Sequence, residues 1–408
     1  MPDAFSPHLS RRTLLGAAGA TFAAAGIPRW ASAAGARDPR LVVVILRGAL
    51  DGLSAAAPIG DPDYVNLHGA LALRWDGPHP ALRLDNFFGL NPAMANFARL
   101  YDAKQAMIIH ATATNYRERS HFDGQDVLES GMQTPGRTES GWLNRAVAAL
   151  PMGERASGPQ ALAVGAVAPL VMRGPAPILG WAPSGLAAPT DDLVARLMDL
   201  YGQSDPGLAK ALQAGLEADR LADRQGMVAL KPTGDPVALM RKAAEGAGRL
   251  MAADDGPRIG ALAFDGWDTH ANEGGATGRL AQLLGGLDGA FAGFESELGP
   301  RWRDTIVVAI TEFGRTAHIN GTVGTDHGTA TVAFLAGGAL AGGRVVADWP
   351  GLSSASLYER RDLKPTTDLR AVLKGVLADH LGLSSEVLAR AVFPDTIGVA
   401  PMKGLIAA

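Results

Sequence analysis

Short apolar runs alternate with segments of helical periodicity along most of the chain. Each run is rich in Val, Ile, Leu or Ala and is bounded by polar residues or glycine, which predicts a buried strand. The first run, at 40–47, carries apolar residues at successive positions, a pattern typical of a parallel sheet that is covered on both faces. The predicted strands are 40–47, 106–110, 258–264, 304–310 and 331–336, with a strand and loop at 161–171.

Between these runs, apolar residues recur three and four positions apart, which predicts amphipathic helices. The predicted helices are 91–103, 122–130, 143–150, 280–298 and 368–381. Strands that alternate with helices over short connections indicate one large α/β domain. A longer helical stretch at about 190–252 interrupts the alternation, and we interpret it as a helical insertion or a crossover.

The first 33 residues predict an export signal. Arg11 and Arg12 precede an apolar run at 14–27, and Ala31-Ser32-Ala33 has the small residues of a cleavage site. Paired arginines favour the twin-arginine route, so we expect a periplasmic or secreted protein whose domain comprises residues 34–408. The apolar run is too short for a stable membrane span, and no later run reaches about 18 uninterrupted apolar residues.

The amino-acid composition excludes several classes of protein and several kinds of active site. The chain of 408 residues is 47% hydrophobic and 19% charged, which supports a large core and excludes a mainly disordered chain. Its net charge of −4 provides no basic field, so we expect no nucleic-acid partner. The absence of Cys excludes disulfides, thiolate zinc sites, iron–sulfur clusters and a thiol nucleophile. A metal site would therefore depend on carboxylates and on the nine His.

Polar residues follow most of the predicted strands. In open α/β sheets, binding sites form at the carboxyl ends of the strands. The candidates are Asp51 after the first strand; Arg119, Ser120 and His121 after the second; Asp268 and His270 after 258–264; Glu312 and Arg315 after 304–310; and Asp326 and His327 before 331–336. A further histidine, His110, ends the second strand and is better explained as a structural residue.

These residue types suit a metal site beside an anion. Imidazole and carboxylate groups are ligands of Zn²⁺, Mn²⁺ and similar ions, and Asp268 and His270 share one face of an extended segment. Metal ions bind phosphate-like groups and lower the pKa of a hydroxyl nucleophile, for which Ser120 is the candidate. His121 is a second candidate catalytic residue, and Arg119 and Arg315 are candidates to clamp an oxyanion.

Each candidate also has a structural interpretation. The alternatives are a turn at Asp51-Gly52, a helix cap at Ser120, a packing histidine at His121, a Gly-rich turn held by Asp268 and His270, a Glu312–Arg315 pair, and an Asx turn at Asp326. No single cluster is specific. Their joint placement at strand ends is the stronger signal for a site.

Several motifs resemble one bacterial family. They are Leu46-Arg47-Gly48-Ala49-Leu50-Asp51-Gly52-Leu53, Arg119-Ser120-His121-Phe122, Gly266-Trp267-Asp268-Thr269-His270, Thr311-Glu312-Phe313-Gly314-Arg315-Thr316 and Gly324-Thr325-Asp326-His327-Gly328. With the paired arginines, they make the chain resemble the family called domain of unknown function 1501 over nearly its whole length after residue 33. That family is similar to the alkaline phosphatase and sulfatase superfamily. The resemblance implies a large mixed, mostly parallel sheet between helical layers.

The resemblance also implies a site with divalent metal ions (Zn, Mn, Mg or Ca) and a hydroxyl nucleophile. It places metal ligands at Asp51, Asp268, His270, Glu312, Asp326 and His327. Glu312 and Phe313 stand where the superfamily usually has an Asp-His pair, so Phe313 replaces the His; an alternative alignment places that pair at Asp326-His327. The segment around Ser120 does not match the superfamily's nucleophile motifs, so two metals, one or none remain open.

Two functions follow as expectations. The first is an exported metal-dependent hydrolase that acts on a small anionic phosphate or sulfate ester. The alternative is an exported binding or assembly protein that retains the fold without the chemistry. An oxidoreductase is disfavoured because no Gly-x-Gly-x-x-Gly motif follows the first strand.

Overall fold

The computed structural model describes residues 37–407 except 137, 151–159, 166, 183–193, 195, 199, 202–204 and 226–234. The predicted export signal at 1–33 lies outside these residues. In the described part of the chain, no helix combines the length and the hydropathy that crossing a bilayer requires.

Among the described residues, nine strands form one sheet in the order β11-β5-β10-β9-β1-β8-β6-β7, with β12 paired to β5. The strands are β1 (Arg40–Arg47), β5 (Ala106–Ala113), β6 (Ala161–Val164), β7 (Ile178–Trp181), β8 (Ile259–Asp265), β9 (Thr305–Ile310), β10 (Thr331–Ala336), β11 (Arg344–Val346) and β12 (Thr367–Asp368). A second, small sheet has the order β2-β4-β3, from β2 (Ala56–Ala57), β3 (Leu82–Arg83) and β4 (Gly89–Leu90).

The large sheet is mixed but mostly parallel. β1 pairs in parallel with β8 and β9, whereas β10 runs antiparallel to both of its neighbours, β5 and β9. Because β5 and β9 flank the reversed strand, they run in the same direction as β1. The carboxyl ends of β1, β5, β8 and β9 therefore share one edge of the sheet with the beginning of β10.

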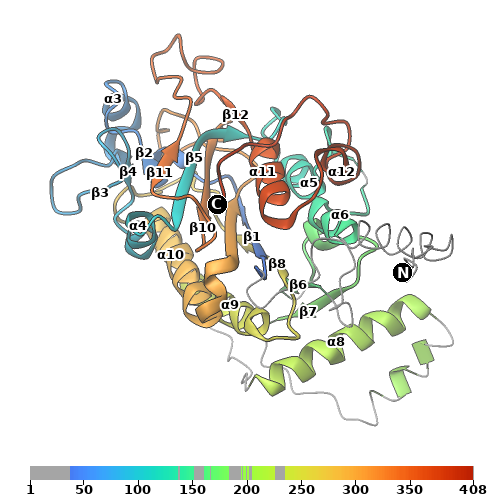
Figure 1. The fold of residues 1–408 in the computed structure, drawn as a ribbon. Coiled ribbons are helices and arrows are strands. Elements are labelled where there is room, and N and C mark those ends of the chain that lie inside the picture. Colours follow the sequence, from blue (N-terminus) through green and yellow to red (C-terminus); the bar gives the residue numbers. More distant parts are fainter. Residues whose placement is uncertain are drawn as a thin grey trace, which may run out of the picture. The chain divides into compact units, whose positions relative to one another are not determined.

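Helices cover both faces of this sheet (Figure 1). The helices of the described residues are α2 (Gly52–Ala55), α3 (Tyr64–His68), α4 (Ala95–Asp102), α5 (His121–Ser130), α6 (Trp142–Ala149), α8 (Pro206–Arg224), α9 (Pro236–Ala252), α10 (Arg279–Leu298), α11 (Leu369–Leu381) and α12 (Ser385–Val387). Side chains alternate between the faces along β1: Val42 and Val44 pack toward α4, α9 and α10, whereas Val43 and Ile45 pack toward α6 and α11.

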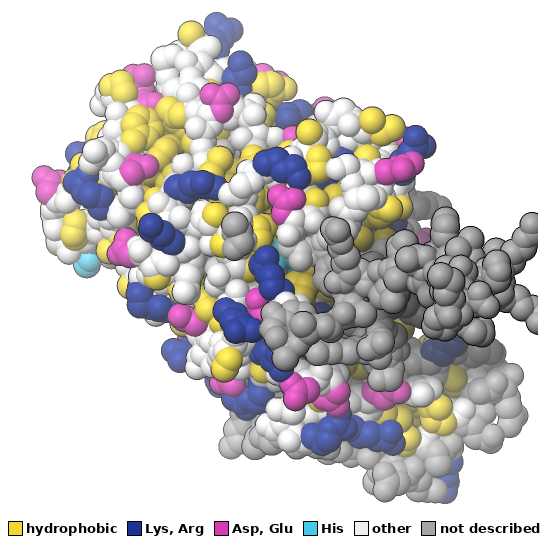
Figure 2. Space-filling model, in the orientation of Figure 1, with side chains coloured by type: hydrophobic (Ala, Val, Ile, Leu, Met, Phe, Trp, Pro, Cys, Tyr) yellow, Lys and Arg dark blue, Asp and Glu magenta, His cyan; other side chains and the backbone are white. Residues whose placement is uncertain are grey.

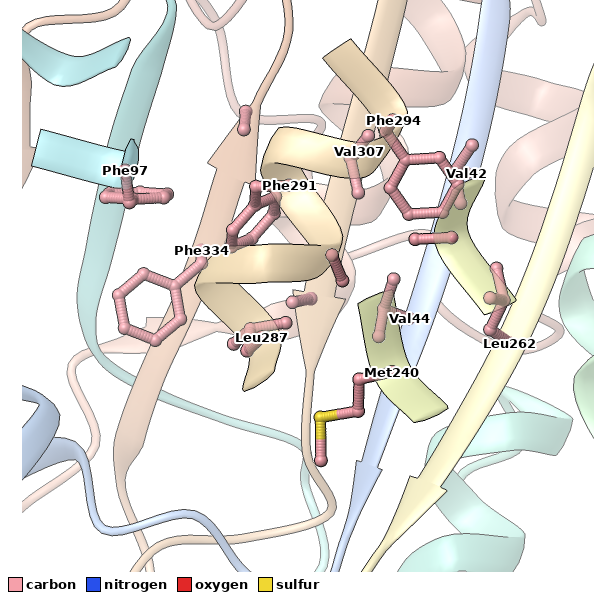
Figure 3. Close-up of a cluster of buried hydrophobic side chains, with 14 of the residues drawn as sticks. Val42, Val44, Phe97, Met240, Leu262, Leu287, Phe291, Phe294, Val307 and Phe334 are labelled. Carbon is pink, nitrogen blue, oxygen red and sulfur yellow. The ribbon is translucent and has the colours of Figure 1, made fainter. Parts of the chain in front are cut away.

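The first of these cores is built from large side chains. Phe294 of α10 lies beside Val42 of β1, Phe291 of the same helix lies beside Phe334 of β10, and Met240 of α9 lies beside Val44 (Figure 3). A second layer of apolar residues on the opposite face explains why β1 has no polar alternation. On the face shown in Figure 2, Lys and Arg side chains lie interspersed with Asp and Glu.

The observed elements agree closely with the predicted ones, and the α/β fold with a mixed, mostly parallel sheet is confirmed. The second strand extends beyond 110 to Ala113, because pairing with β10 and β12 continues there. Within the stretch at 190–252, α9 lies between β7 and β8 in the sequence and packs against the core.

Candidate metal centre

Four donor groups converge at the carboxyl edge of the sheet. His121 begins α5, Asp268 and His270 follow β8, and His327 precedes β10. Nε2 of His327 lies 2.9 Å from Nε2 of His121 and 3.0 Å from Nε2 of His270. The Asp268 carboxylate lies 3.3, 3.1 and 3.4 Å from Nε2 of His121, His270 and His327, respectively. We call these four residues the donor cluster.

The other ring nitrogen of each histidine faces an acceptor oxygen. Nδ1 of His121 lies 2.9 Å from Glu312 Oε1, Nδ1 of His270 lies 3.3 Å from Asp326 Oδ1, and Nδ1 of His327 lies 3.1 Å from the backbone oxygen of Arg119. Carbonyl and carboxylate oxygens accept hydrogen bonds, so each Nδ1 donates. The lone pair of each neutral ring is then on Nε2, which faces the cluster. Metal-binding histidines usually have such an outer acceptor.

The cluster is therefore rich in lone pairs and negative charge. A hydrogen bond to Glu312 raises the pKa of His121, whereas burial and the charge of His121 lower the pKa of His327. The two shifts differ in direction because one protonated ring opposes a second proton beside it. Burial raises the pKa of Asp268, but the hydrogen bond from Arg315 outweighs burial and the pKa is lowered, which keeps this carboxylate ionised.

The donor set fits a divalent metal ion. Tetrahedral metal–nitrogen bonds of about 2.0–2.1 Å place ligand atoms about 3.3 Å apart. The five distances within the cluster range from 2.9 to 3.4 Å. Donor atoms of His121, Asp268 and His327 all lie within 4.8 Å of one another. The four side chains are 23–44% exposed, so an ion and a small ligand can reach them from solvent.

Phe313 and Gly48 constrain the geometry of the donor cluster. Phe313 is buried and its ring centroid lies 5.1 Å from that of His121 and 5.4 Å from that of His327. Gly48, at the end of β1, has φ of +121°, and a Cβ atom there would lie 2.6 Å from the backbone nitrogen of Asp268. Glycine is required at this position because it allows β1 to approach the Asp268 segment that closely.

Two predicted metal ligands, Glu312 and Asp326, instead contact histidines of the donor cluster from behind. Glu312 is fully buried, and its Oε1 accepts hydrogen bonds from Gly48 N–H at 2.9 Å and from Gln125 at 3.1 Å as well as from His121. These bonds outweigh burial and lower the pKa of Glu312. Asp326 accepts from Asn320 at 3.1 Å and from His270. Both carboxylates thus stand behind a ring, on the side away from the cluster.

The two predicted oxyanion clamps are also engaged elsewhere. Arg315 has a fully buried side chain, and it donates to Asp268 Oδ1 at 2.5 Å and to the hydroxyl and carbonyl oxygens of Thr325. Arg119 donates to Asp362 at 2.9 Å and to Glu359 at 2.6 Å. Both guanidinium groups are hydrogen-bonded to side chains of the protein. The predicted role of these two arginines in binding an oxyanion therefore does not match their contacts.

Asp51 lies in a buried network with His68 and Glu273, which Thr325 links to Arg315. Its Oδ1 caps α2 by accepting the Leu53 N–H at 2.9 Å, and its Oδ2 lies 3.0 Å from Nε2 of His68. Burial raises the pKa of Asp51, but the charge and hydrogen bond of His68 outweigh burial and lower this pKa to about 2. The prediction that Asp51 binds the metal with the strand-end residues therefore does not match its placement, since its oxygens are used by α2 and His68.

Glu273 hydrogen-bonds to Asp51 as a second carboxyl group. Its Oε2 accepts from the Thr325 hydroxyl at 2.6 Å, and its Oε1 is buried without any other partner in the described part of the chain. Burial and the charge of Asp51 raise the pKa of Glu273 to about 9. Burial and the neighbouring charge of Asp51 therefore favour the neutral form of Glu273.

The structure also shows the contacts of Ser120 and His110. Ser120 is the N-cap residue of α5, but its side chain makes no capping hydrogen bond; its N–H donates to the Tyr116 hydroxyl at 3.3 Å. His110 is fully buried, donates from Nε2 to the Ala56 oxygen at 2.9 Å, and has its pKa lowered to about 4 by burial, as a structural histidine would.

His68 and Glu273 were not predicted from the sequence. Glu273 lies only three residues after His270, which is the one signal that pointed to it, whereas His68 lies in a helix far from any predicted strand end.

Comparison with known proteins gives a family and several distant likenesses. A family model described as "Protein of unknown function (DUF1501)" matches residues 38–392. No curated protein matches the sequence. The structure of Ps i-CgsB in complex with k-i-k-neocarrahexaose is 10% identical in sequence to this chain, with a TM-score of 0.39. The matched region covers 89% of this chain and 77% of that chain.

Two hydrolases are similar at comparable distance. Phosphonoacetate hydrolase from Sinorhizobium meliloti 1021, in complex with phosphonoformate, is 12% identical with a TM-score of 0.30, covering 68% of this chain and 57% of that one. Phosphonate monoester hydrolase of Agrobacterium radiobacter is 10% identical with a TM-score of 0.34, covering 85% and 74%.

Proposed function

The chain belongs to the DUF1501 family, and from its donor cluster we propose that it is a metal-dependent hydrolase of phosphate or sulfate esters, exported by the twin-arginine route. One observation carries the proposal: three Nε2 atoms and the Asp268 carboxylate meet within 2.9–3.4 Å, and every ring donates outward from Nδ1. Without a cation or a proton between them, these lone pairs repel one another. His121, previously a candidate catalytic residue, becomes a ligand.

The donor chemistry selects the ion. Three imidazoles and one carboxylate suit Zn²⁺ better than Mg²⁺ or Ca²⁺, which prefer sets of oxygen ligands. When bound, the ion would act as a Lewis acid toward an ester oxygen. Glu312 and Asp326 hold the rings of His121 and His270 in the tautomer that binds metal, and Arg315 holds the Asp268 carboxylate.

Ser120 is the proposed nucleophile. It directly precedes His121, and its hydroxyl is not used to cap α5. Attack of this hydroxyl on phosphorus or sulfur forms a seryl ester and breaks the bond to the alcohol, which leaves with the proton of Ser120. Water then hydrolyses the seryl ester and returns the proton to the hydroxyl.

Metal content tests the proposal first. We expect one metal ion per chain in the wild type, and strong loss of metal in Asp268→Ala. Asp265→Ala is the matched control, because Asp265 is an exposed aspartate at the end of the same strand. Less than about 0.1 metal ion per chain after exposure to Zn²⁺, Mn²⁺, Mg²⁺ and Ca²⁺ would refute the metal site.

A second candidate is a binding protein that retains the site without turnover. The four-donor cluster favours it, because metal sites closed by four protein ligands are usually structural, whereas catalytic zinc sites keep an open position. Nitrophenyl phosphate, a nitrophenyl phosphodiester and nitrophenyl sulfate distinguish the two functions. Metal-dependent turnover that is lost in Ser120→Ala supports the hydrolase, whereas one bound metal per chain without turnover supports the binding protein.

A further inference from the structure

A fully buried carboxylate connects the two chain segments that carry His121 and His327. Asp362 Oδ2 accepts hydrogen bonds from Nε of Arg119 at 2.9 Å and from the Thr329 hydroxyl at 2.7 Å, and it lies 2.8 Å from Nη2 of Arg119. Arg119 lies two residues before His121. Thr329 lies two residues after His327. One carboxylate oxygen therefore holds together the segments whose histidines meet in the donor cluster.

Arg119 reaches His327 through its backbone. The backbone oxygen of Arg119 accepts a hydrogen bond from Nδ1 of His327 at 3.1 Å, which leaves Nε2 of that ring to face the cluster. Arg119 has φ of +58°, in the left-handed region that residues other than glycine seldom occupy. Such a conformation persists where surrounding contacts hold it, and the ion pair with Asp362 is a contact of this kind.

Asp362 is itself held by backbone contacts. Its N–H donates to the Tyr358 oxygen at 3.0 Å, and its backbone oxygen accepts from the Tyr358 N–H at 2.9 Å. The preceding residue, Arg361, donates to the backbone oxygen of His327 at 2.8 Å. Because these contacts fix Asp362 independently of Arg119, its carboxylate can set the position of the Arg119 side chain.

The second acidic partner of Arg119 lies in a different environment. Glu359 accepts from Arg119 at 2.6 Å, but its side chain is 54% exposed, whereas that of Asp362 is fully buried. Solvent screens an exposed ion pair, so such a pair constrains a side chain weakly. Loss of one partner of a buried pair leaves the other charge without compensation. The constraint on Arg119 therefore comes mainly from Asp362.

We propose that Asp362 is a positioning residue of the metal centre. Through Arg119, it holds the ring of His327 in the tautomer that donates outward from Nδ1 and faces the other donors with Nε2. This inference rests on the proposed function and specifies what maintains the geometry of its metal site.

Zinc affinity, measured by chelator competition on the full-length protein, is the first test. We expect Asp362→Asn to weaken Zn²⁺ binding about 10- to 100-fold, the range for loss of an outer partner of a metal-binding histidine. Glu359→Gln is the matched control, because it removes the other acidic partner of the same arginine, and its affinity should stay within about twofold of the wild type. In an Arg119→Gln background, Asp362→Asn should add little, because its effect passes through Arg119. Effects that multiply in the double variant, or equal losses in Asp362→Asn and Glu359→Gln, would overturn the role.

The ring tautomer of His327 is a readout that a general loss of stability would not move. Nitrogen NMR of the metal-free protein with labelled histidine, at about pH 8 and thus above the ordinary pKa of histidine, reports this tautomer. His327→Gln identifies the signals. We expect the proton on Nδ1 in the wild type and in Glu359→Gln, and a partial shift of the proton to Nε2 in Asp362→Asn. If Asp362→Asn does not fold, Arg119→Lys takes its place, since lysine keeps the charge but loses the planar group that spans the carboxylate.

This readout also separates the inference from the proposed function. If the wild type binds no metal, the proposed function fails, and the tautomer in the metal-free protein still decides the role of Asp362. An unchanged tautomer in the folded variant overturns the role of Asp362 whatever its zinc affinity, and it leaves the metal site of a metal-binding wild type intact.

Discussion

Replacing Glu273 with glutamine should change how the stability of the protein depends on pH. Glu273 is buried, hydrogen-bonds to Asp51, and has its pKa raised to about 9 by burial and by the charge of Asp51. Glutamine has the same shape, and its amide can donate to Asp51 while its oxygen accepts from Thr325. We therefore expect Glu273→Gln to fold normally and to bind metal normally.

The magnitude follows from proton linkage. In the unfolded chain a glutamate titrates near its ordinary value of 4.5, whereas in the folded protein Glu273 titrates near 9. The stabilisation from the neutral carboxyl is complete below pH 4.5 and is lost as the pH rises toward 9, because the folded state holds one more proton in this window. The slope is about 1.4 kcal/mol per pH unit, or about 2.7 kcal/mol between pH 6 and pH 8.

Urea unfolding at pH 6, 7 and 8 measures this effect. The free energy of unfolding of Glu273→Gln, minus that of the wild type, should increase by about 2.7 kcal/mol from pH 6 to pH 8. Taking the difference removes contributions that both proteins share, including that of His68. Glu386→Gln, on the surface at α12, should show no such trend. A constant difference across these pH values would show that Glu273 is not a neutral proton donor to Asp51.

Four further outcomes test the site and the export signal. Glu312→Gln should weaken Zn²⁺ binding about 10- to 100-fold in a chelator competition, because it replaces the charged acceptor that orients His121 with a weaker, neutral amide oxygen; an unchanged affinity would contradict that role. Gly48→Ala should destabilise the protein by more than about 2 kcal/mol in urea, since its Cβ would lie 2.6 Å from the Asp268 nitrogen. Chelation of the metal at neutral pH should lower the Tm of the wild type but not that of His327→Ala, and equal shifts would place the ion elsewhere. Replacing Arg11 and Arg12 together with Lys should keep the protein in the cytoplasm with an uncut N-terminus, whereas normal export would exclude the twin-arginine route.

Much of the fold was predictable because local patterns carry it. The apolar run at 40–47 predicted a strand covered on both faces, and its neighbours in the sheet, β8 and β9, are the runs predicted at 258–264 and 304–310. The polar residues after these runs were expected at one edge, and the parallel pairing of β1, β8 and β9 places them there. The reversed strand β10 was not predicted, yet its reversal brings His327 to the same edge, because β10 begins where the parallel strands end.

The roles within the site were less predictable, because they depend on the direction of each side chain beyond its strand. Glu312 and His121 were both candidates, but only the folded backbone shows that the carboxylate lies behind the ring. Glu312 reaches the Gly48 N–H and His121 Nδ1, which leaves Nε2 of His121 to face the cluster. Residues with positive φ, such as Gly48 and Arg119, set these directions where strand periodicity no longer applies.

By itself, therefore, the sequence determined the strands, the helices, the edge of the sheet that carries polar residues, and a supply of His and carboxylates without Cys. These properties depend on periodicity and composition, which are local. Only the tertiary structure decided which groups face the centre, which stand behind them, and that Asp51 pairs with His68. His121 and His327 are 206 residues apart in the chain, and their contact depends on long-range strand pairing and backbone geometry that no local pattern encodes.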